Sequence, residues 1–274
     1  MIDALTACVA LFGNPVAHSL SPQMHNAAFK HLGLNMIYLA FQVERAADAA
    51  AAMRACGFHG ASVTVPHKEA MLVHLDEIDE ASRTIGAVNT IINRQGRLVA
   101  GNTDWLGVVR SLEQATELAG KRCLILGAGG AARAAVYGLG RAGVQVFLTN
   151  RTEVRGRRLA DDLQCTFVHW HSWEHLEVDL LVNATTVGMG TGQSPVPRKW
   201  LRSGMVVMDM VYRPPRTRLL RDAEEAGCQA ISGLDMLLYQ GAAQLELWTC
   251  RRAPLEIMRR ALMEGLGHET DQNR

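Results

Sequence analysis

The stretch Lys121–Arg155 reads KRCLILGAGGAARAAVYGLGRAGVQVFLTNRTEVR, and it decides the fold. Residues 123–126 are a short apolar run that predicts a buried strand. The glycine-rich turn 127–132 follows, and an alanine-rich pattern then predicts a helix to about residue 142. Residues 145–149 predict a second strand. A strand, a glycine turn, a helix and a strand within roughly 30 residues are the context that indicates a dinucleotide-binding unit.

The small residues of the turn have distinct expected roles. Gly127 permits the tight turn, Gly129 lets the backbone approach a pyrophosphate, and Ala132 allows the helix to pack closely on the strand. The N–H groups at the helix N-terminus carry a partial positive charge that attracts phosphate. The alternative interpretation is a glycine-rich loop in an α/β domain that binds no cofactor.

The end of the second strand indicates which dinucleotide binds. An acidic residue about 20 residues past the glycines would bind the ribose 2′-hydroxyl of NAD. This chain has Asn150, Arg151 and Thr152 there instead, and Arg155 follows one turn later. Because two guanidinium groups and a hydroxyl suit a 2′-phosphate, we expect NADP(H) as the cofactor.

Length and composition narrow the class of protein. The 274 residues suffice for one large domain or two medium ones, and 48% of them are hydrophobic, as in a globular protein. A net charge of +1 gives no electrostatic indication of a nucleic-acid or membrane partner. The six cysteines are scattered without a CxxC motif, no run of about 18 apolar residues occurs, and the start lacks a signal-peptide profile. We therefore expect a cytoplasmic protein with reduced thiols, no membrane segment, no nucleic-acid partner and a small-molecule substrate.

Residues 1–104 predict an α/β domain of their own, because strand-like and helix-like segments alternate. The expected elements are strands at 9–12, 36–43 and 60–65, helices at 21–33, 45–55 and 67–80, and a hairpin formed by 87–93 and 97–101.

Residues 105–234 predict a doubly wound Rossmann domain, because a helix at 107–118 is followed by six strands, the number in a complete fold of this kind. The expected strands are 123–126, 145–149, 165–170, 179–185, 206–212 and 229–232. Two final helices within 235–274 are expected to complete the first domain. The predicted fold class is thus α/β: an N-terminal α/β substrate domain plus a C-terminal doubly wound Rossmann NADP-binding domain, with a cleft between them.

A lysine and an aspartate of the first domain suit acid–base chemistry. Ser62 and Thr64 alternate onto one face of a strand, and Lys68 lies in the first turn of the next helix, where a cation opposes the helix dipole. Asp104 ends the hairpin at the domain junction. Such a pair suits proton transfer coupled to hydride transfer at a carbonyl. The alternatives are an exposed surface lysine and an aspartate that caps the helix at 107.

Other polar residues of the first domain have two interpretations each. Ser19 and Ser21 lie beside a helix N-terminus and suit a carboxylate ligand, but Ser21 also suits an N-cap in front of Pro22. Asn89 is polar in an otherwise apolar strand. For His67 we expect a solvated side chain at the helix start, although it is placed to tune Lys68.

Three histidines lie close together in the second domain: His169, His171 and His175. No fourth ligand or ligand motif accompanies them, so we expect no metal site.

Nine motifs resemble, in the same order, those of the shikimate dehydrogenase family. They are GNPVAHSLSP at 13–22, VTVPHK at 63–68, GAVNT at 86–90, GNTDW at 101–105, GAGGAAR at 127–133, NRT at 150–152, NATTVGM at 183–189, DMVY at 209–212 and LLYQGAAQ at 237–244. The resemblance covers nearly the full chain. It implies NADP-dependent, reversible reduction of 3-dehydroshikimate to shikimate, a step of the shikimate pathway of chorismate and aromatic amino acid biosynthesis.

The resemblance also implies residue roles. The catalytic pair would be Lys68 and Asp104. The substrate-binding residues would be Ser19, Ser21, Thr64, Asn89, Tyr212 and Gln240. The cofactor-binding residues would be Gly127, Ala128, Gly129, Gly130, Ala131, Asn150, Arg151, Thr152, Arg155, Met210 and Gly233.

The chain departs from the family at Ser62, where the family often has Asn. Serine is shorter and offers one donor where an amide offers two. Substrate affinity and the choice between shikimate and quinate therefore stay open, and so does assembly as a monomer or a homodimer. The alternatives are a quinate/shikimate dehydrogenase of broader specificity, a two-domain enzyme of folate oxidation and a non-catalytic NADP-binding regulator.

Overall fold

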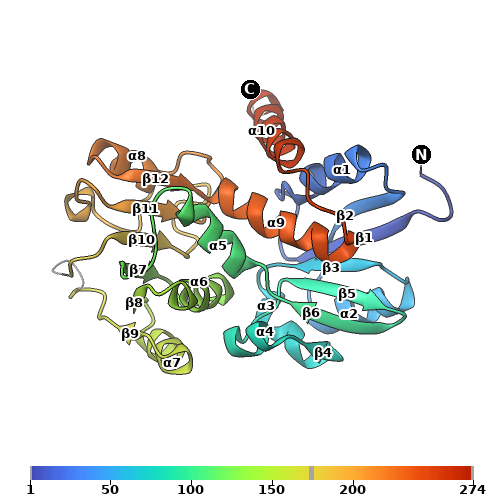
Figure 1. The fold of residues 1–274 in the computed structure, drawn as a ribbon, viewed down its shortest axis with the longest axis horizontal. Helices are drawn as coiled ribbons and strands as arrows, with labels where there is room; N and C mark the ends of the chain where they lie inside the picture. Colours follow the sequence, from blue (N-terminus) through green and yellow to red (C-terminus); the bar gives the residue numbers. More distant parts are fainter. Residues whose placement is uncertain (1, 173–175, 273–274) are drawn as a thin grey trace. The chain divides into compact units, whose positions relative to one another are not determined.

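The computed structural model describes residues 2–172 and 176–272. The chain divides into two compact units: unit 1 runs to Thr103 and resumes at Leu238, and unit 2 is Asp104–Leu237. Each unit has a six-stranded sheet (Figure 1). Within the described ranges, no helix combines the length and the apolar character needed to cross a membrane.

The sheet of unit 1 is mixed. Its strands are β1 Ala7–Gly13, β2 Met36–Gln42, β3 Gly60–Val63, β4 Glu77–Ile78, β5 Thr90–Arg94 and β6 Arg97–Gly101, in the order β2-β1-β3-β5-β6-β4. β1 pairs in parallel with β2 and β3, whereas β5 is antiparallel to β3 and β6. The predicted hairpin is confirmed: it turns through Gln95 and Gly96, both with positive φ, as a two-residue hairpin turn requires.

The main helices of unit 1 have one buried face each, except α9, whose residues 240–245 are all buried. They are α1 Ser21–His31, α2 Ala46–Ala55, α4 Glu80–Ile85, α10 Leu255–Gln272 and most of α9 Gly233–Thr249. In α2, Ala46, Ala49, Ala50 and Met53 follow the helical spacing and are buried in one core with Phe12 of β1. The alanine-rich segment is therefore an amphipathic helix on the sheet.

Residues 67–80 do not form the single helix that the sequence predicts. The chain makes only a short helix, α3 His67–Ala70, and a 3-10 turn, η1 Met71–His74, before strand β4. β4 pairs with β6, and Asp76 Oδ2 accepts the Leu98 N–H at 2.7 Å. Sheet pairing and this side-chain bond to the backbone outweigh the local helical pattern.

The sheet of unit 2 is parallel throughout. Its strands are β7 Arg122–Leu126, β8 Gln145–Thr149, β9 Thr166–Phe167, β10 Leu180–Asn183, β11 Val206–Asp209 and β12 Gln229–Ser232. Their order is β12-β11-β10-β7-β8-β9. Strands β8 and β9 lie on one side of β7, and β10, β11 and β12 lie on the other, which is the doubly wound arrangement. The predicted Rossmann fold is therefore confirmed.

Side chains of β7 alternate between two apolar cores of unit 2. Cys123 and Ile125 belong to one core, and Leu124 and Leu126 belong to the other. Helices α5 Asp104–Glu113, α6 Gly130–Arg141 and α7 Glu153–Leu163 contribute to the first core, and α8 Arg218–Glu225 contributes to the second. A strand buried on both faces reads as a continuous apolar run, as this one does.

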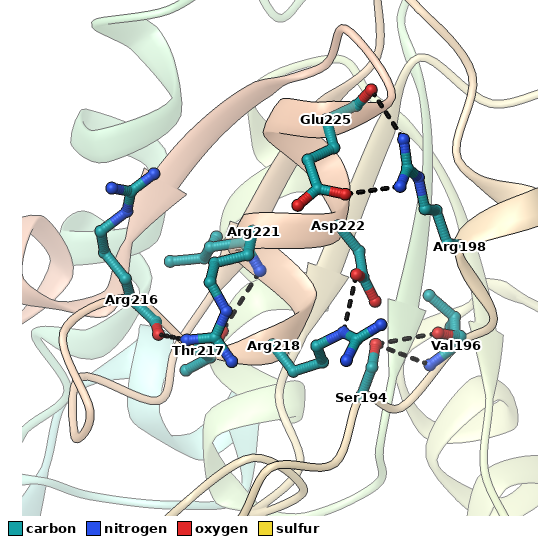
Figure 2. Close-up of polar contacts among 10 residues, drawn as sticks. Ser194, Val196, Arg198, Arg216, Thr217, Arg218, Arg221, Asp222 and Glu225 are labelled. Carbon is teal, nitrogen blue, oxygen red and sulfur yellow. Dashed lines mark hydrogen bonds and ion pairs between the residues drawn. The ribbon is translucent and has the colours of Figure 1, made fainter.

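Charged side chains flank helix α8 (Figure 2). Arg198, in the 3-10 turn η3 Arg198–Trp200, binds the carboxylate of Glu225, and Arg218 Nε donates to Asp222 Oδ1 at 2.7 Å. The Arg198–Glu225 pair is exposed and therefore contributes little to stability, whereas the Asp222 side chain is buried. We attribute the position of α8 mainly to the burial of Leu219 in the core.

Candidate functional site

Asn89 is the centre of a buried hydrogen-bond cluster in unit 1. Its Oδ1 accepts the Thr90 hydroxyl and the Thr103 N–H, each at 2.7 Å. Its Nδ2 donates to Thr103 Oγ1 at 3.0 Å and to Gln240 Oε1 at 3.2 Å. Asn89 is only 1% exposed. The cluster thus brings two predicted substrate residues, Asn89 and Gln240, into direct contact from distant parts of the chain.

Thr64 lies just past β3, against the end of β1. Its N–H donates to the Phe12 carbonyl at 2.9 Å, and its side chain is half-buried. A Cβ at Gly13 would overlap the Thr64 methyl group and lie 3.0 Å from the Val65 carbonyl oxygen. Glycine at position 13 is therefore what lets β1 approach the segment that carries Thr64.

Backbone contacts connect the predicted catalytic pair to the Asn89 cluster. The half-buried Lys68 lies in α3, and its carbonyl accepts the N–H of Val88, the neighbour of Asn89, at 3.0 Å. Asp104 follows Thr103 directly and is 3% exposed. Helix α5 begins at Asp104 itself, not at residue 107, so the interpretation of Asp104 as a cap in front of a helix at 107 is wrong.

Ser21 does not cap helix α1. The helix begins at Ser21, its N-cap residue is Leu20, and no side chain makes a capping hydrogen bond at the cap. Ser19 Oγ instead accepts the Ser21 N–H at 3.2 Å, and Ser21 is 7% exposed. Both hydroxyls therefore lie at the first turn of an 11-residue helix, where N–H groups attract an anion.

His67 is not the solvated side chain that we expected. It is 4% exposed, and its Nε2 lies 2.8 Å from the Val43 carbonyl oxygen. Because a ring nitrogen that contacts a carbonyl must carry a hydrogen, this contact fixes the orientation of the ring. His67 thus anchors α3 to the end of β2.

The glycine turn of unit 2 has the geometry of a phosphate cradle. Gly127 has φ of 115°, and a Cβ there would lie 2.9 Å from the Ala184 carbonyl oxygen, so only glycine fits. Gly129 is the N-cap of α6 and makes no side-chain cap, and a Cβ there would meet no described atom within 4 Å. The first N–H groups of α6 are therefore free of side-chain caps and suit a pyrophosphate, with the adjoining Ala128, Gly130 and Ala131 half-buried.

The basic residues predicted to bind a 2′-phosphate lie after β8: Arg151 is in the turn before α7, and Arg155 is in the first turn of α7. Asn150 Nδ2 donates to the Thr152 carbonyl at 2.8 Å, which shapes the turn. Arg151 and Arg155 are exposed, and neither forms an ion pair with another described residue. Two guanidinium groups without a carboxylate partner suit a phosphate.

A buried carboxylate, Asp209, organises the loops that follow β10 and β11. Its oxygens accept the Asn183 amide at 2.9 Å, the Val211 N–H at 3.0 Å and the Thr217 hydroxyl at 2.6 Å. Asp209 is 0% exposed, and burial raises the pKa of this carboxyl above its ordinary value, although the three hydrogen bonds counter that shift. These bonds fix the ends of the segment that carries Met210 and Tyr212.

Met210 and Gly233 lie side by side in unit 2. A Cβ at Gly233 would lie 2.5 Å from the Met210 carbonyl oxygen, so glycine is required for this approach. The Met210 N–H donates to the Asn183 carbonyl at 3.0 Å. Tyr212, two residues further, is half-buried. The structure thus joins two of the residues predicted to line the nicotinamide end of the cofactor.

Sequence inspection missed two polar groups of these clusters. Gln244 Nε2 donates to the Asn89 carbonyl at 3.0 Å and to Thr90 Oγ1 at 3.1 Å. Its signal was its spacing, because Gln240 and Gln244 are four residues apart on one face of an apolar helix. Asp209 lay within the predicted strand 206–212 as a single acid among apolar residues, a pattern that does not reveal its burial.

The histidines near residue 170 divide between described and undescribed positions. His169 Nδ1 lies 3.3 Å from Glu153 and its Nε2 lies 3.0 Å from Arg157, on the surface of unit 2. His175 lies outside the described residues. Across the described part of the chain, no group of three or more potential ligands has the arrangement of a metal site.

Comparison with known proteins matches this chain to the shikimate dehydrogenase family. A model described as the shikimate dehydrogenase substrate binding domain matches residues 11–91, and a model of the shikimate 5′-dehydrogenase C-terminal domain matches residues 233–263. The shikimate dehydrogenase (NADP(+)) of Moorella thermoacetica is 48% identical, over 97% of this chain and 96% of that protein. Its counterpart in Pyrococcus abyssi is 46% identical, over 94% and 97%.

A solved structure extends the similarity to three dimensions. The shikimate 5-dehydrogenase of Thermus thermophilus, in complex with NADP(H) and shikimate, superposes with a TM-score of 0.90 at 38% identity. The match covers 95% of this chain and 100% of that one.

Proposed function

Because this chain belongs to the shikimate dehydrogenase family, we propose that Lys68 and Asp104 are the acid–base pair of an NADP-dependent shikimate dehydrogenase. The enzyme interconverts 3-dehydroshikimate and shikimate, the reaction of its relatives over nearly the full chain. The structural observation that carries the assignment of the pair is their connection to the Asn89 cluster, through Val88 on one side and Thr103 on the other.

Unit 1 is proposed to bind the substrate. The Ser19 and Ser21 hydroxyls at the first turn of α1 suit the substrate carboxylate. Thr64, Asn89 and Gln240 offer hydroxyl and amide groups that suit the ring hydroxyls. Tyr212 of unit 2 is proposed as a further contact to the substrate. Burial of Ser21, Asn89 and Gln240 supports recognition, because a buried polar site rejects a ligand that leaves its groups unpaired.

Unit 2 is proposed to bind NADP(H) through the glycine turn and the basic residues after β8. The uncapped N–H groups of α6 hold the pyrophosphate, and Arg151 and Arg155 hold the 2′-phosphate. Asn150 and Thr152 shape the turn between them. Met210 and Gly233 line the nicotinamide end. When bound, NADPH supplies the hydride.

Lys68 supplies the proton that completes the reduction. As the carbonyl carbon of the substrate gains a hydride, the electron pair of its C=O bond moves onto oxygen, and the Lys68 ammonium transfers one proton to that oxygen. Lys68 becomes a neutral amine and regains its proton from solvent. Asp104 is proposed to hold the Lys68 side chain in position for this transfer. The reverse reaction uses the same groups in the opposite protonation states.

Substitution of the pair tests this proposal. Lys68→Ala should lower kcat for shikimate oxidation by roughly 10²–10⁴-fold, the usual scale for a lost acid–base group. Asp104→Asn keeps the shape of the side chain, removes its charge, and should lower kcat in the same direction. The assay is the absorbance of NADPH during turnover of shikimate and NADP⁺. Stabilisation of Lys68→Ala by NADP⁺ should stay as in the wild type, and a loss of activity below about threefold would remove Lys68 from the mechanism.

We also propose that the enzyme works in the cytoplasm, as a monomer or a homodimer. All six cysteines are free thiols, which supports a reducing compartment. Light scattering of the purified protein measures the assembly state, and a stable tetramer would contradict this proposal.

A further inference from the structure

Ser62, the residue that departs from the family, uses both of its hydrogen-bonding roles within the protein. Its Oγ accepts the Tyr38 hydroxyl at 2.7 Å and donates to Gln244 Oε1 at 3.0 Å. Ser62 is 5% exposed, Tyr38 is 0% and Gln244 is 2% exposed. A hydroxyl has a single proton to donate, so that of Ser62 is committed to Gln244. An asparagine at this position would have two N–H donors instead.

Gln244 connects the Ser62 hydroxyl to strand β5 through hydrogen bonds. Because its Oε1 accepts from Ser62, its Nε2 faces β5 and donates to the Asn89 carbonyl at 3.0 Å and to Thr90 Oγ1 at 3.1 Å. Thr90 Oγ1 accepts from Gln244 and donates its own proton to Asn89 Oδ1 at 2.7 Å. The donors from Tyr38 to Thr90 therefore form one continuous series that ends at Asn89.

Asn89 connects Thr90 to Gln240 through hydrogen bonds of its side-chain amide. With its Oδ1 accepting from Thr90, Asn89 directs Nδ2 toward Thr103 and toward Gln240 Oε1, 3.2 Å away. This contact turns the oxygen of the Gln240 amide toward Asn89 and its nitrogen to the other side. The hydrogen-bond series from Tyr38 through Ser62 and Gln244 thus decides which atoms of two substrate residues face which way.

We propose that Ser62 is a positioning residue for substrate binding, which acts through Gln244 on Asn89 and Gln240 and makes no contact with the substrate. This inference rests on the proposed function, in which Asn89 and Gln240 bind the substrate. In a buried series each bond polarises the next, and a missing member leaves its partners unsatisfied away from water. The loss of Ser62 Oγ leaves both Tyr38 and Gln244 without their partner.

The experiment is a double-mutant cycle between Ser62 and Gln244, read as steady-state kinetics of the full-length enzyme with shikimate and NADP⁺. Ser62→Ala should raise KM for shikimate about tenfold, the scale of one lost buried hydrogen bond. It should change kcat by less than about threefold and leave KM for NADP⁺ unchanged, because the loss lies in substrate binding. Gln244→Met, which removes the polar end at similar length, should raise KM for shikimate at least as much.

The decisive comparison is Ser62→Ala in the Gln244→Met background. If Ser62 acts through Gln244, the second change adds less than about twofold to KM, because the link is already broken. A full tenfold effect in that background overturns the proposal and makes Ser62 a direct substrate contact. If Ser62→Ala is too unstable to assay, Tyr38→Phe replaces it in the cycle, since it removes the donor to Ser62.

Ser82→Ala is the matched control. Ser82 is also a buried serine of unit 1, 0% exposed, but its hydroxyl has no hydrogen-bond partner among the described residues. KM for shikimate should stay as in the wild type. An unchanged KM in Ser62→Ala, with only a lower melting temperature, overturns the inference and leaves the proposed function standing. No turnover of shikimate by the wild type overturns the proposed function itself and the inference with it.

Discussion

His25 is a titratable side chain enclosed by aromatic rings. It is 0% exposed, stacks on Tyr38 with ring centroids 4.6 Å apart, and lies 5.2 Å from the Trp248 ring. Neither ring nitrogen has a partner with hydrogen-bond geometry among the described residues. Burial lowers the pKa of His25 from 6.5 to about 3, and the nearby Gln244 amide offsets part of the shift. The folded protein therefore keeps this ring neutral.

The pH dependence of stability should reflect the protonation of His25. Between pH 6.5 and about 3 the unfolded chain binds a proton at His25 that the folded chain does not. The stability contributed by this group is thus fully present above pH 6.5 and is lost as the pH falls, by at most about 1.4 kcal/mol per pH unit. His25→Phe keeps a stacked ring and cannot titrate. Its free energy of unfolding in urea should fall less steeply than that of the wild type between about pH 7 and 5.

Phe29→Leu provides the comparison for this prediction. Phe29 is buried in the same helix and does not titrate, so its replacement should lower stability at every pH and leave the slope of stability against pH unchanged. Equal slopes for His25→Phe and the wild type would show that His25 does not control acid stability.

At the residue scale, the sequence predicted which polar side chains have a particular role, but not which hydrogen-bond partners each of them has in the fold. The contact between Asn89 and Gln240 joins segments far apart in the chain, and the similarity of the motifs alone indicated it. Ser21 was ambiguous because a cap and a first helical residue differ by one position. His67 and Asp209 were misjudged or missed because burial is a property of the packed chain, which no local pattern records.

At the scale of elements, Thr217 couples helix α8 to the buried Asp209. It is the N-cap of α8: its Oγ1 accepts the Leu220 N–H at 3.3 Å and donates to Asp209 Oδ2 at 2.6 Å. Thr217→Val keeps the shape and removes both bonds. It should lower the free energy of unfolding by about 2–3 kcal/mol. One part comes from the lost cap, and the rest comes from the buried Asp209 carboxylate, which loses one of its three donors. Urea unfolding measures this difference.

Thr152→Val is the control for the cap. Thr152 is the N-cap of α7, but its side chain makes no capping hydrogen bond, so the same change should cost less than about 0.5 kcal/mol. Equal losses in the two variants would refute the role assigned to Asp209.

Elements were predictable where one local signal dominated. The hairpin β5–β6 was predicted because two strand-like runs flank Arg94-Gln95-Gly96, and in the structure Gln95 and Gly96 take the positive φ that the turn needs. The helix expected over 67–80 was wrong because Asp76 bonds to Leu98 of β6, a contact that only the folded sheet provides. The sequence pattern did not predict helices α7 and α8, although it predicted the six strands of unit 2 around them.

At the scale of the whole molecule, the cofactor preference should appear as stabilisation of the fold. A ligand that binds only the folded chain stabilises it by about 2.7 kcal/mol at a hundredfold excess over Kd. NADP⁺ should therefore raise the melting temperature more than NAD⁺ at equal concentration. In Arg151→Ala and Arg155→Ala this difference should shrink, and kcat/KM for NADPH should fall about 10–100-fold while that for NADH changes little.

Arg158→Ala is the control for general charge. Arg158 is exposed on the same helix α7 and has no proposed contact with the cofactor. A preference for NADPH that survives in both Arg151→Ala and Arg155→Ala would exclude these residues as the 2′-phosphate site.

The architecture was largely predictable at this scale. Alternating strands and helices with a glycine turn predicted a doubly wound domain of six strands, which the structure confirms for unit 2. The mixed sheet of unit 1 was only partly predictable, because β4 has two residues and gains its identity from pairing with β6.

The path of the chain through unit 1 has a consequence for its biosynthesis. The core of unit 1 includes Trp248 of α9, whose indole donates to the Ile91 carbonyl at 3.0 Å and whose ring occupies the space beside Gly60. A ribosome makes about 5–20 residues per second and releases the strands of unit 1 first, but it delivers this tryptophan only after all of unit 2. During synthesis, strands β1 to β6 are therefore made several seconds before helix α9 becomes available to pack on them. We expect the cofactor unit, although begun second, to be the first to finish folding.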